Sequence, residues 1–369
     1  MEITRPTLLL DVAKCRANME RMVKRAERPG VRLRPHFKTH QSRVVGGWFR
    51  DFGVTAIAVS SVEMADYFTD AGFTDITIAF PINLLEIPRV DELASKARVN
   101  CLVESVEAVR ALDEGIEMEV GVFVKVDTGY HRTGMLADNV NDIEAVLDVI
   151  DVSSKLRPRG LLTHAGHSYG AGSREKILDI HRDSTAKMRA LKERLTSKWP
   201  GLELSVGDTP TCSLADDFTG IDEIRPGNFV FYDVMQSEFG SCGFDDVAIA
   251  LACPIVAKHT SRNEVVIYGG AVHLSKDYVL DANGDKCFGL VVELDARGWG
   301  SPIEGARVVS VSQEHGVISM RTSFFNKLNV GDTIGILPIH ACLTANLMRG
   351  YVTTGGESID HLSGTVRKC

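Results

Sequence analysis

Residues 120–134 read VGVFVKVDTGYHRTG, in which a short apolar, β-branched run ends directly before a loop of polar and glycine residues. Similar runs recur up to residue 225, and helical patterns lie between most of them. The predicted strands are 31–37, 56–60, 76–80, 100–103, 120–126, 160–164, 202–206 and 223–225, and the predicted helices are 12–26, 44–51, 62–71, 84–96, 106–114, 139–150 and 174–199. Strands that alternate with helices indicate right-handed βαβ units and a parallel sheet. Eight such units predict an α/β fold, a (β/α)8 TIM barrel over residues 11–237, with a doubly wound open sheet as the alternative.

The alternation of strands and helices stops near Asp233. Short strand-like runs broken by Gly, Asn and Asp follow, and no long amphipathic helix lies between them. These runs are 247–259, 264–269, 288–295, 307–312, 317–320, 333–337 and 351–353. This pattern predicts a C-terminal all-β domain over residues 238–369, joined by a strand from residues 1–10.

The bulk composition is that of a two-domain soluble protein. The chain has 369 residues, 44% of them hydrophobic and 24% charged. Its net charge of −8 argues against nucleic acid or an anionic membrane as a partner. No apolar run approaches the roughly 20 residues that span a bilayer, and no signal-peptide core is present, so we expect a cytoplasmic location. The eight cysteines are expected to be reduced thiols, namely Cys15, Cys101, Cys212, Cys242, Cys253, Cys287, Cys342 and Cys369.

Polar residues crowd the C-terminal ends of the predicted barrel strands, where the active site of such a barrel lies. Lys38 ends the first strand in the stretch HFKTH, between aromatic and histidine neighbours. Partial desolvation at that rim favours Schiff-base chemistry at its amino group. The loops after strands seven and eight are the usual phosphate cradle of this fold, because they supply backbone N–H groups, small residues and a hydroxyl. The cradle residues are Gly207, Thr209, Pro226, Gly227 and Asn228.

Several motif blocks, in the same order, resemble one family of enzymes. The blocks are RPHFKTH (34–40), VDTGYHRTG (126–134), AGHSY (165–169), GDTP (207–210) and EIRPGN (223–228). They are similar to the D-threonine aldolase / eukaryotic-type D-serine dehydratase family of fold type III, alanine-racemase-like enzymes. The resemblance implies pyridoxal 5′-phosphate (PLP) held as a Schiff base on Lys38, a small D-amino acid as substrate and a homodimer. It also implies a cofactor contact at Tyr169, whereas Arg132 is either a cofactor contact or part of a structural ion pair.

His340 and Cys342 form a candidate metal pair in the predicted β domain. On an extended segment, side chains two residues apart point the same way, and thiolate plus imidazole suits zinc. The spacing alone fits a buried cysteine beside an ordinary histidine better than it fits a metal site. The resemblance implies a divalent metal here. Zinc is typical of the dehydratases that carry this His-x-Cys form, with manganese or magnesium as alternatives.

The predicted activity is that of a PLP- and metal-dependent lyase acting on D-3-hydroxy amino acids. We expect a dehydratase that converts D-serine or D-threo-3-hydroxyaspartate to a 2-oxo acid and ammonia, with Lys38 moving the α-proton. The main alternative is a D-threonine aldolase, in which His167 takes the proton of the β-hydroxyl and the products are glycine and an aldehyde. An amino-acid racemase and a non-catalytic PLP-binding protein are weaker alternatives.

Overall fold

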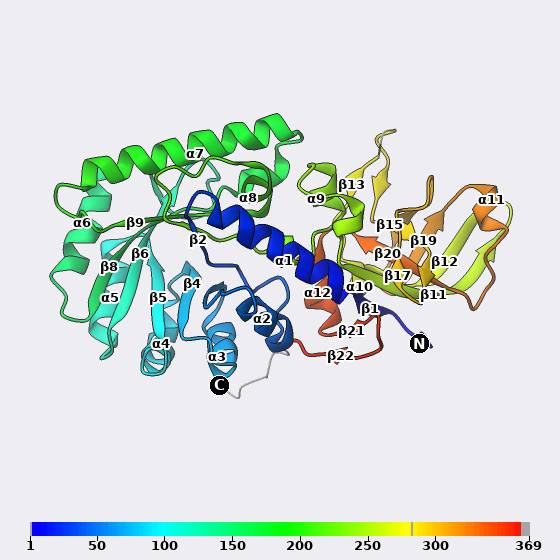
Figure 1. Cartoon of the computed structure of the whole chain (residues 1–369), viewed down its shortest axis with the longest axis horizontal. Coiled ribbons are helices and arrows are strands. Elements are labelled where there is room, and N and C mark those ends of the chain that lie inside the picture. Colours follow the sequence, from blue (N-terminus) through cyan, green and yellow to red (C-terminus); the bar gives the residue numbers. More distant parts are fainter. Residues whose placement is uncertain (1, 282, 363–369) are drawn as a thin grey trace. The chain divides into compact units, whose positions relative to one another are not determined.

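A computed structural model describes residues 2–281 and 283–362 of the chain, which forms two compact units (Figure 1). The barrel unit consists of Arg21–Lys38 and Gly46–Gly227. The β unit consists of Met1–Glu20, Thr39–Val45 and Asn228–Cys369. The domain ranges expected from the sequence, residues 11–237 and 238–369, stay predictions.

Eight parallel strands form the barrel, and a ninth, the short β7 (Met135–Leu136), pairs with β6 beside it. The barrel strands are β2 (Arg32–Leu33), β3 (Ala56–Val59), β4 (Asp75–Pro81), β5 (Arg98–Val103), β6 (Val120–Asp127), β8 (Leu156–Leu162), β9 (Glu203–Val206) and β10 (Glu223–Ile224). Their order is β2-β10-β9-β8-β6-β5-β4-β3, and a parallel bridge between His36 and Ala58 links the two ends. The sheet is therefore a near-closed barrel. The predicted barrel is confirmed, and the open-sheet alternative is wrong.

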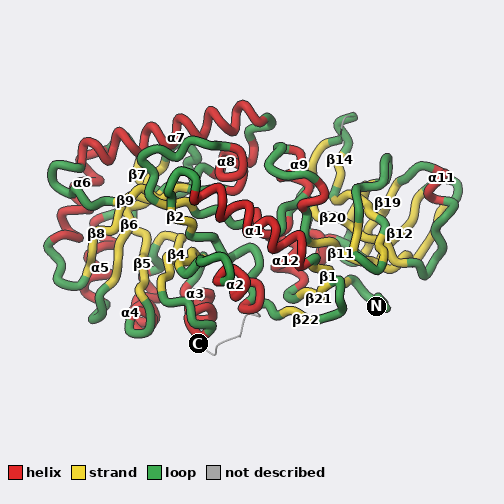
Figure 2. The backbone as a smooth tube through the Cα atoms, in the orientation of Figure 1, coloured by secondary structure: helices red, strands yellow, loops and turns green. Residues whose placement is uncertain are grey.

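Helices connect successive barrel strands and lie outside them (Figures 1 and 2). They are α2 (Arg43–Arg50), α3 (Val62–Asp70), α4 (Ile87–Ala94), α5 (Val106–Gly115), α6 (Val140–Asp151), α7 (Arg174–Leu195) and the short α8 (Thr209–Leu214), and α1 (Val12–Glu27) precedes the first strand. Helices α3, α5 and α7 begin at Ser61, Ser105 and Ser173, whose side chains each accept a backbone N–H from the first turn. These serines directly precede apolar periodic segments, which is why the helix starts could be predicted.

The first barrel strand is much shorter than the predicted strand over residues 31–37. Pro35 has no N–H to donate to a strand ladder, so the regular pairing of β2 ends before it. Beyond β2, the chain makes backbone hydrogen bonds to both neighbouring strands, β10 and β3. The N–H of Arg34 donates to Ile224 and that of Phe37 donates to Ala58, at 2.9 and 2.8 Å. This crossing segment closes the barrel and leads directly into Lys38.

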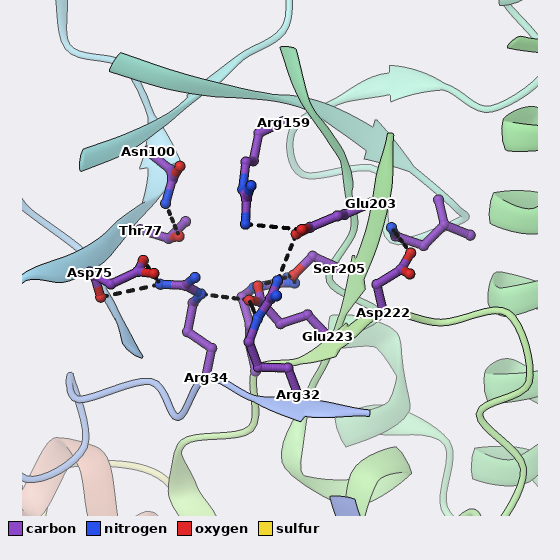
Figure 3. A network of polar contacts seen from close by, with 12 residues as sticks. Arg32, Arg34, Asp75, Thr77, Asn100, Arg159, Glu203, Ser205, Asp222 and Glu223 are labelled. Atoms are coloured by element: carbon purple, nitrogen blue, oxygen red, sulfur yellow. Dashed lines mark hydrogen bonds and ion pairs between the residues drawn. The ribbon is translucent and has the colours of Figure 1, made fainter. Parts of the chain in front are cut away.

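The barrel unit contains a buried ion-pair network (Figure 3). Arg34 and Glu223 are both 0% exposed, and Nε of Arg34 donates to Glu223 at 2.7 Å. Arg34 also pairs with Asp75 at 2.7 Å, and Arg32 pairs with Glu223 at 2.8 Å. Burial raises the pKa of Glu223, but the charges of Arg34 and Arg32 and hydrogen bonds lower it to about 2. Arg32 and Arg34 therefore share the buried carboxylate of Glu223.

The β unit is built on a nine-stranded sheet (Figure 2). Its strands are β1 (Thr7–Leu10), β11 (Ile249–His259), β12 (Glu264–Tyr268), β15 (Gly289–Val292), β18 (Arg307–Val311), β19 (His315–Ser319), β20 (Thr333–Pro338), β21 (Tyr351–Thr353) and β22 (Ser358–Ile359). Strand β1 pairs antiparallel with β11 and parallel with β21, which confirms that the N-terminal strand joins this unit. Short helices interrupt the strands, namely α9 (Val234–Glu238), α10 (Ala271–Leu274), α11 (Thr322–Phe325) and α12 (Ala341–Met348).

Two expectations from composition bear on the described residues. No helix there has the length and apolar character needed to cross a membrane. None of the seven cysteines in the described part of the chain forms a disulfide there, and the eighth, Cys369, lies outside it.

Candidate active site

Lys38 lies in the turn after β2, at the C-terminal end of the barrel strands. The residue before it, Phe37, is fully buried in a cluster of aromatic rings. Its ring centroid lies 4.9 to 5.2 Å from those of Phe49, Phe68 and Phe73. The Lys38 side chain is exposed, so the protein alone does not provide the desolvation that we expected. The buried ring fixes the backbone of the turn, while the amino group stays accessible to a ligand.

The loop after β6 carries Arg132 and is organised by Asp127. The Asp127 carboxylate accepts the backbone N–H groups of Gly129, Tyr130 and His131 and contacts Nδ1 of His131 at 2.8 Å. Burial raises the pKa of Asp127, but these hydrogen bonds lower it below its usual range. The Arg132 guanidinium carbon lies 4.9 Å from the centre of the Tyr130 ring, a cation–π contact. Asp127 therefore shapes the loop that presents Arg132.

His164, for which no role could be predicted, belongs to the same cluster. Its Nδ1 donates to the carbonyl of Gly207 at 2.7 Å. Burial lowers the pKa of His164, the bond to Gly207 opposes this, and the nearby charges of Lys38 and Arg132 lower it further, to about 3. A neutral imidazole therefore stands beside two cationic side chains.

His167 lies in the turn after β8, with its ring stacked on Tyr130 at 6.2 Å between centroids and 25° between planes. A Cβ on Gly166 would lie 2.4 Å from the Tyr130 ring, so only glycine allows this close packing. Burial lowers the pKa of His167. Its Nδ1 is buried and finds no hydrogen-bond partner in the described residues. An imidazole with an unused nitrogen suits acid–base work.

The loops after β9 and β10, which carry most of the predicted cradle residues, pack against each other. The N–H of Thr209 donates to the Tyr169 hydroxyl at 3.2 Å, and Thr209 Oγ1 accepts the Gly227 N–H at 3.3 Å. Gly207 has φ +152°, and a Cβ there would lie 2.5 Å from the backbone N of Arg225. The two loops therefore approach as closely as only glycine permits, and the hydroxyls of Tyr169 and Thr209 accept their backbone N–H groups.

Two predicted cofactor contacts, Pro226 and Asn228, have other partners. The carbonyl of Pro226 accepts the N–H of His36 at 2.9 Å, which ties the cradle to the turn that carries Lys38. The Asn228 side chain donates to Asp233 at 2.6 Å and lies 3.7 Å from the sulfur of Cys342. Asn228 thus belongs to the β unit, and its amide faces the predicted metal pair.

Sequence reasoning missed two buried cations near the mouth of the barrel. Lys125, on β6, has its pKa lowered to about 7 by burial and by the charges of Arg225 and Arg132. Arg225 has its pKa lowered to about 10 by burial, although Glu223 opposes the change. It donates to the hydroxyl of Ser205, which in turn donates to Glu223 at 2.6 Å. A charged residue inside an apolar strand pattern was the available signal.

In the β unit, His340 and Cys342 lie together. Burial lowers the pKa of His340, but a hydrogen bond to Cys342, the charges of Cys342 and Asp233, and a bond to Asp277 raise it to about 10. The segment is not extended as predicted. His340 is the N-cap of α12 and Cys342 lies in its first turn, because Asp233 accepts the N–H of Ala341 and begins the helix there. The expectation of an extended segment is wrong, but the two side chains still meet.

Two neighbouring side chains lie within hydrogen-bond distance of the Cys342 sulfur. The Asn228 amide donates to it at 3.7 Å, and the Thr39 hydroxyl lies 3.2 Å from it, where either group can be the donor. Donors of this kind stabilise a thiolate, which is the form that binds metal. In the described residues, no group of three or more His, Cys, Asp and Glu side chains is placed to hold an ion. An imidazole and a thiol that lie together have the chemistry of zinc ligands, and two protein ligands leave open positions for other ligands.

Each unit gathers a share of the predicted site residues. The barrel unit brings together Lys38, Arg132, His167, Tyr169, Gly207, Thr209, Pro226 and Gly227 at the C-terminal ends of its strands. The β unit brings together Asn228, His340 and Cys342. Fold and site together define an α/β-barrel protein with an accessible lysine at the mouth of the barrel.

Residues 10–234 match the alanine racemase N-terminal domain, and residues 248–354 match a putative serine dehydratase domain. The first match spans more than half of the chain. The chain therefore belongs to the alanine racemase N-terminal-domain family.

Curated relatives and solved structures resemble the chain over nearly its whole length. The D-threo-3-hydroxyaspartate dehydratase of Delftia sp. (strain HT23) is 28% identical over 94% of this chain and 93% of its own. Its structure superposes with a TM-score of 0.90 over 98% of each chain. The D-serine dehydratase of Dictyostelium discoideum is 28% identical over 94% of this chain and 92% of its own. The D-threonine aldolase of Arthrobacter sp. is 23% identical over 94% of this chain and 88% of its own.

A further solved structure bears on the metal. It is a D-threo-3-hydroxyaspartate dehydratase with a cysteine-to-alanine mutation in the metal-free form, 27% identical, with a TM-score of 0.90 over 98% of each chain. The family resemblance predicted from the motif blocks is confirmed by these comparisons.

Proposed function

We propose that this protein is a PLP- and metal-dependent lyase that removes water from a D-3-hydroxy amino acid. The products are a 2-oxo acid and ammonia: oxaloacetate from D-threo-3-hydroxyaspartate or pyruvate from D-serine. The observation that carries the proposal is the convergence of His340 and Cys342. A metal suits a reaction at the β-hydroxyl, whereas a racemase needs a second base and no metal. The likeness to two dehydratases over both units supports the same reaction.

The barrel unit supplies the residues that would hold the cofactor. Lys38 would bind it covalently, and the loops around Gly207, Thr209 and Gly227 would receive the phosphate. Tyr169 is tied to this cradle through Thr209. When bound, PLP acts as an electron sink that weakens the bonds to the substrate Cα.

Lys38 is the proposed base of the reaction, because its amino group is accessible and lies where the cofactor is held. The substrate amine would first take the place of Lys38 on the cofactor, and the released amino group would then take the proton from Cα as the β-hydroxyl leaves. His164 stays neutral at working pH, so it adds no further positive charge beside Lys38. Arg132, placed over Tyr130, supplies a fixed positive charge on the same rim.

His340 and Cys342 are the proposed metal ligands. A bound divalent metal acts as a Lewis acid on the β-hydroxyl and makes it a better leaving group. Zinc is the proposed ion, because thiolate and imidazole together favour it over manganese and magnesium. Water leaves, and the enamine that is released hydrolyses to the 2-oxo acid and ammonia.

The second candidate function is a retro-aldol cleavage at the same residues. His167 favours it, because its buried Nδ1 lacks a partner in the described residues and its ring lies beside Tyr130. In that reaction His167 takes the proton of the β-hydroxyl, the Cα–Cβ bond breaks, and glycine and an aldehyde form.

Product analysis separates the two functions. The protein, loaded with PLP and zinc, is incubated with D-threo-3-hydroxyaspartate, D-serine and D-threonine, and 2-oxo acid, ammonia, glycine and aldehyde are quantified. The proposal expects equal amounts of oxo acid and ammonia from at least one substrate. Glycine and aldehyde without oxo acid would establish the aldolase instead. His167→Asn is the matched variant, because it should abolish the aldolase reaction but leave most of the dehydratase reaction.

The homodimer and the cytoplasmic location expected from the sequence stay predictions. Light scattering of the PLP-loaded protein tests the dimer directly, against a monomer mass of 40.3 kDa.

A further inference from the structure

Asp277 lies against one ring nitrogen of His340. Its Oδ2 is 3.0 Å from His340 Nδ1, although the two residues are 63 positions apart in the sequence. A carboxylate can only accept at this contact, so Nδ1 carries the proton. With Nδ1 holding its proton against Asp277, Nε2 is the ring nitrogen left to bind a metal.

We infer that Asp277 is a positioning residue for His340: it fixes the ring and the tautomer that present Nε2 to a metal. The inference rests on the proposed metal site at His340 and Cys342. Histidine ligands of metals usually donate their second N–H to a carboxylate or carbonyl, which orients the ring and raises the basicity of the ligating nitrogen.

The segment that carries Asp277 is shaped to reach His340. Helix α10 ends at Leu274. The next residue, Ser275, is not a glycine but has φ +74°, which turns the chain sharply. The Ser275 hydroxyl then accepts the N–H of Asp277 at 3.1 Å. Thr344, in α12, donates to the carbonyl of Leu274 at 3.3 Å. This bond ties the end of α10 to the helix that begins at His340, and the unusual backbone is thereby held in place.

Asp277 is placed to act through His340, because its Oδ2 accepts the proton of His340 Nδ1 and is therefore engaged with the imidazole ring. The other carboxylate nearby, Asp233, is occupied by the N–H groups of Gln236 and Ala341 and by the Asn228 amide. Asp233 therefore holds the backbone of the segment that carries His340 and Cys342, and Asp277 orients the His340 imidazole.

Zinc titration tests the inference without any turnover assay. The full-length, PLP-loaded protein is stripped of metal and titrated with zinc against a chromophoric chelator. We expect Asp277→Ala to weaken zinc binding by about 10- to 100-fold. Asp277→Asn should lose less zinc affinity than Asp277→Ala, because its amide oxygen still accepts the N–H of His340 Nδ1. The matched control is Glu314→Gln, since Glu314 lies 3.8 Å from a different histidine, His273, and this variant should bind zinc like wild type.

Cobalt in place of zinc separates a positioning residue from a ligand. Its visible bands report the coordination number, and its thiolate charge-transfer band reports Cys342. At saturation the Asp277→Ala spectrum should match that of wild type. A changed coordination number would make Asp277 a ligand and overturn the inference, as would wild-type zinc affinity in Asp277→Ala. If the wild-type protein itself binds no zinc, the proposed metal site fails and the inference falls with it.

Discussion

At the scale of single residues, Gly207 is the clearest case of a backbone constraint at the cofactor cradle. Its φ is +152°, and an added Cβ would lie 2.5 Å from the Arg225 backbone. Gly207→Ala should lower the free energy of unfolding by about 1–3 kcal/mol and weaken PLP binding. Thermal melting and PLP titration measure both effects. Gly170→Ala is the matched control, because no atom lies within 4 Å of the added Cβ, and it should leave both quantities unchanged.

Lys125 gives a pH-dependent prediction at the same scale. Burial lowers its pKa from 10.5 to about 7, so between pH 7 and pH 10.5 the unfolded chain binds the proton more tightly than the folded one. The contribution of Lys125 to stability therefore rises with pH across that window. The free energy of unfolding of wild type minus that of Lys125→Met should increase by up to about 1.4 kcal/mol per pH unit from pH 7 to pH 9. A difference that stays flat would show that Lys125 is not buried with a lowered pKa.

At the scale of elements, the short strand β10 depends on the charge of Glu223. The carboxylate is 0% exposed and pairs with Arg34 and Arg32. Glu223→Gln removes the partner of a buried arginine, and we expect a loss of about 3–5 kcal/mol in the free energy of unfolding at pH 7.

The pH dependence of that loss follows from the pKa of Glu223, which is lowered to about 2 from an ordinary 4.5. The stability due to the charge is fully present above pH 4.5 and is lost as the pH falls toward 2. The gap between wild type and Glu223→Gln, measured by denaturant unfolding, should therefore shrink below pH 4.5. An equal gap at pH 7 and pH 3 would contradict the ion-pair account.

The alternation of strands and helices was sufficient to predict the barrel and most of its elements. The length of the first strand was overestimated. The pattern of residues 31–37 does not show that the chain crosses between two neighbouring strands beyond Pro35. Lys38, the cradle glycines and the His340–Cys342 pair could be selected because loop position, backbone freedom and ligand chemistry are local properties. Asp277, His164 and Lys125 could not, because their roles arise from partners far away in the sequence.

At the scale of the whole molecule, the proposed PLP residues belong to the barrel unit and the proposed metal ligands belong to the β unit. Removing the metal with a chelator should abolish turnover, and the PLP absorbance should remain, because Lys38 and the cradle belong to the barrel unit. Added zinc should restore turnover. Cys342→Ala should lose zinc and activity together. Cys242→Ala should keep both, because the Cys242 thiol is hydrogen-bonded to Ser237 and is not a proposed metal ligand. Full activity after chelation, with no residual metal by mass spectrometry, would show that the reaction does not need a metal.

The most direct test of the central claim is to trap the cofactor on Lys38. The PLP-loaded protein is reduced with borohydride, digested and mapped by mass spectrometry. We predict one pyridoxyl group, on the peptide that contains Lys38, and none on Lys125. Lys38→Ala should show no reducible linkage and no turnover. A pyridoxyl group on another lysine, or a reducible linkage that persists in Lys38→Ala, would contradict the account.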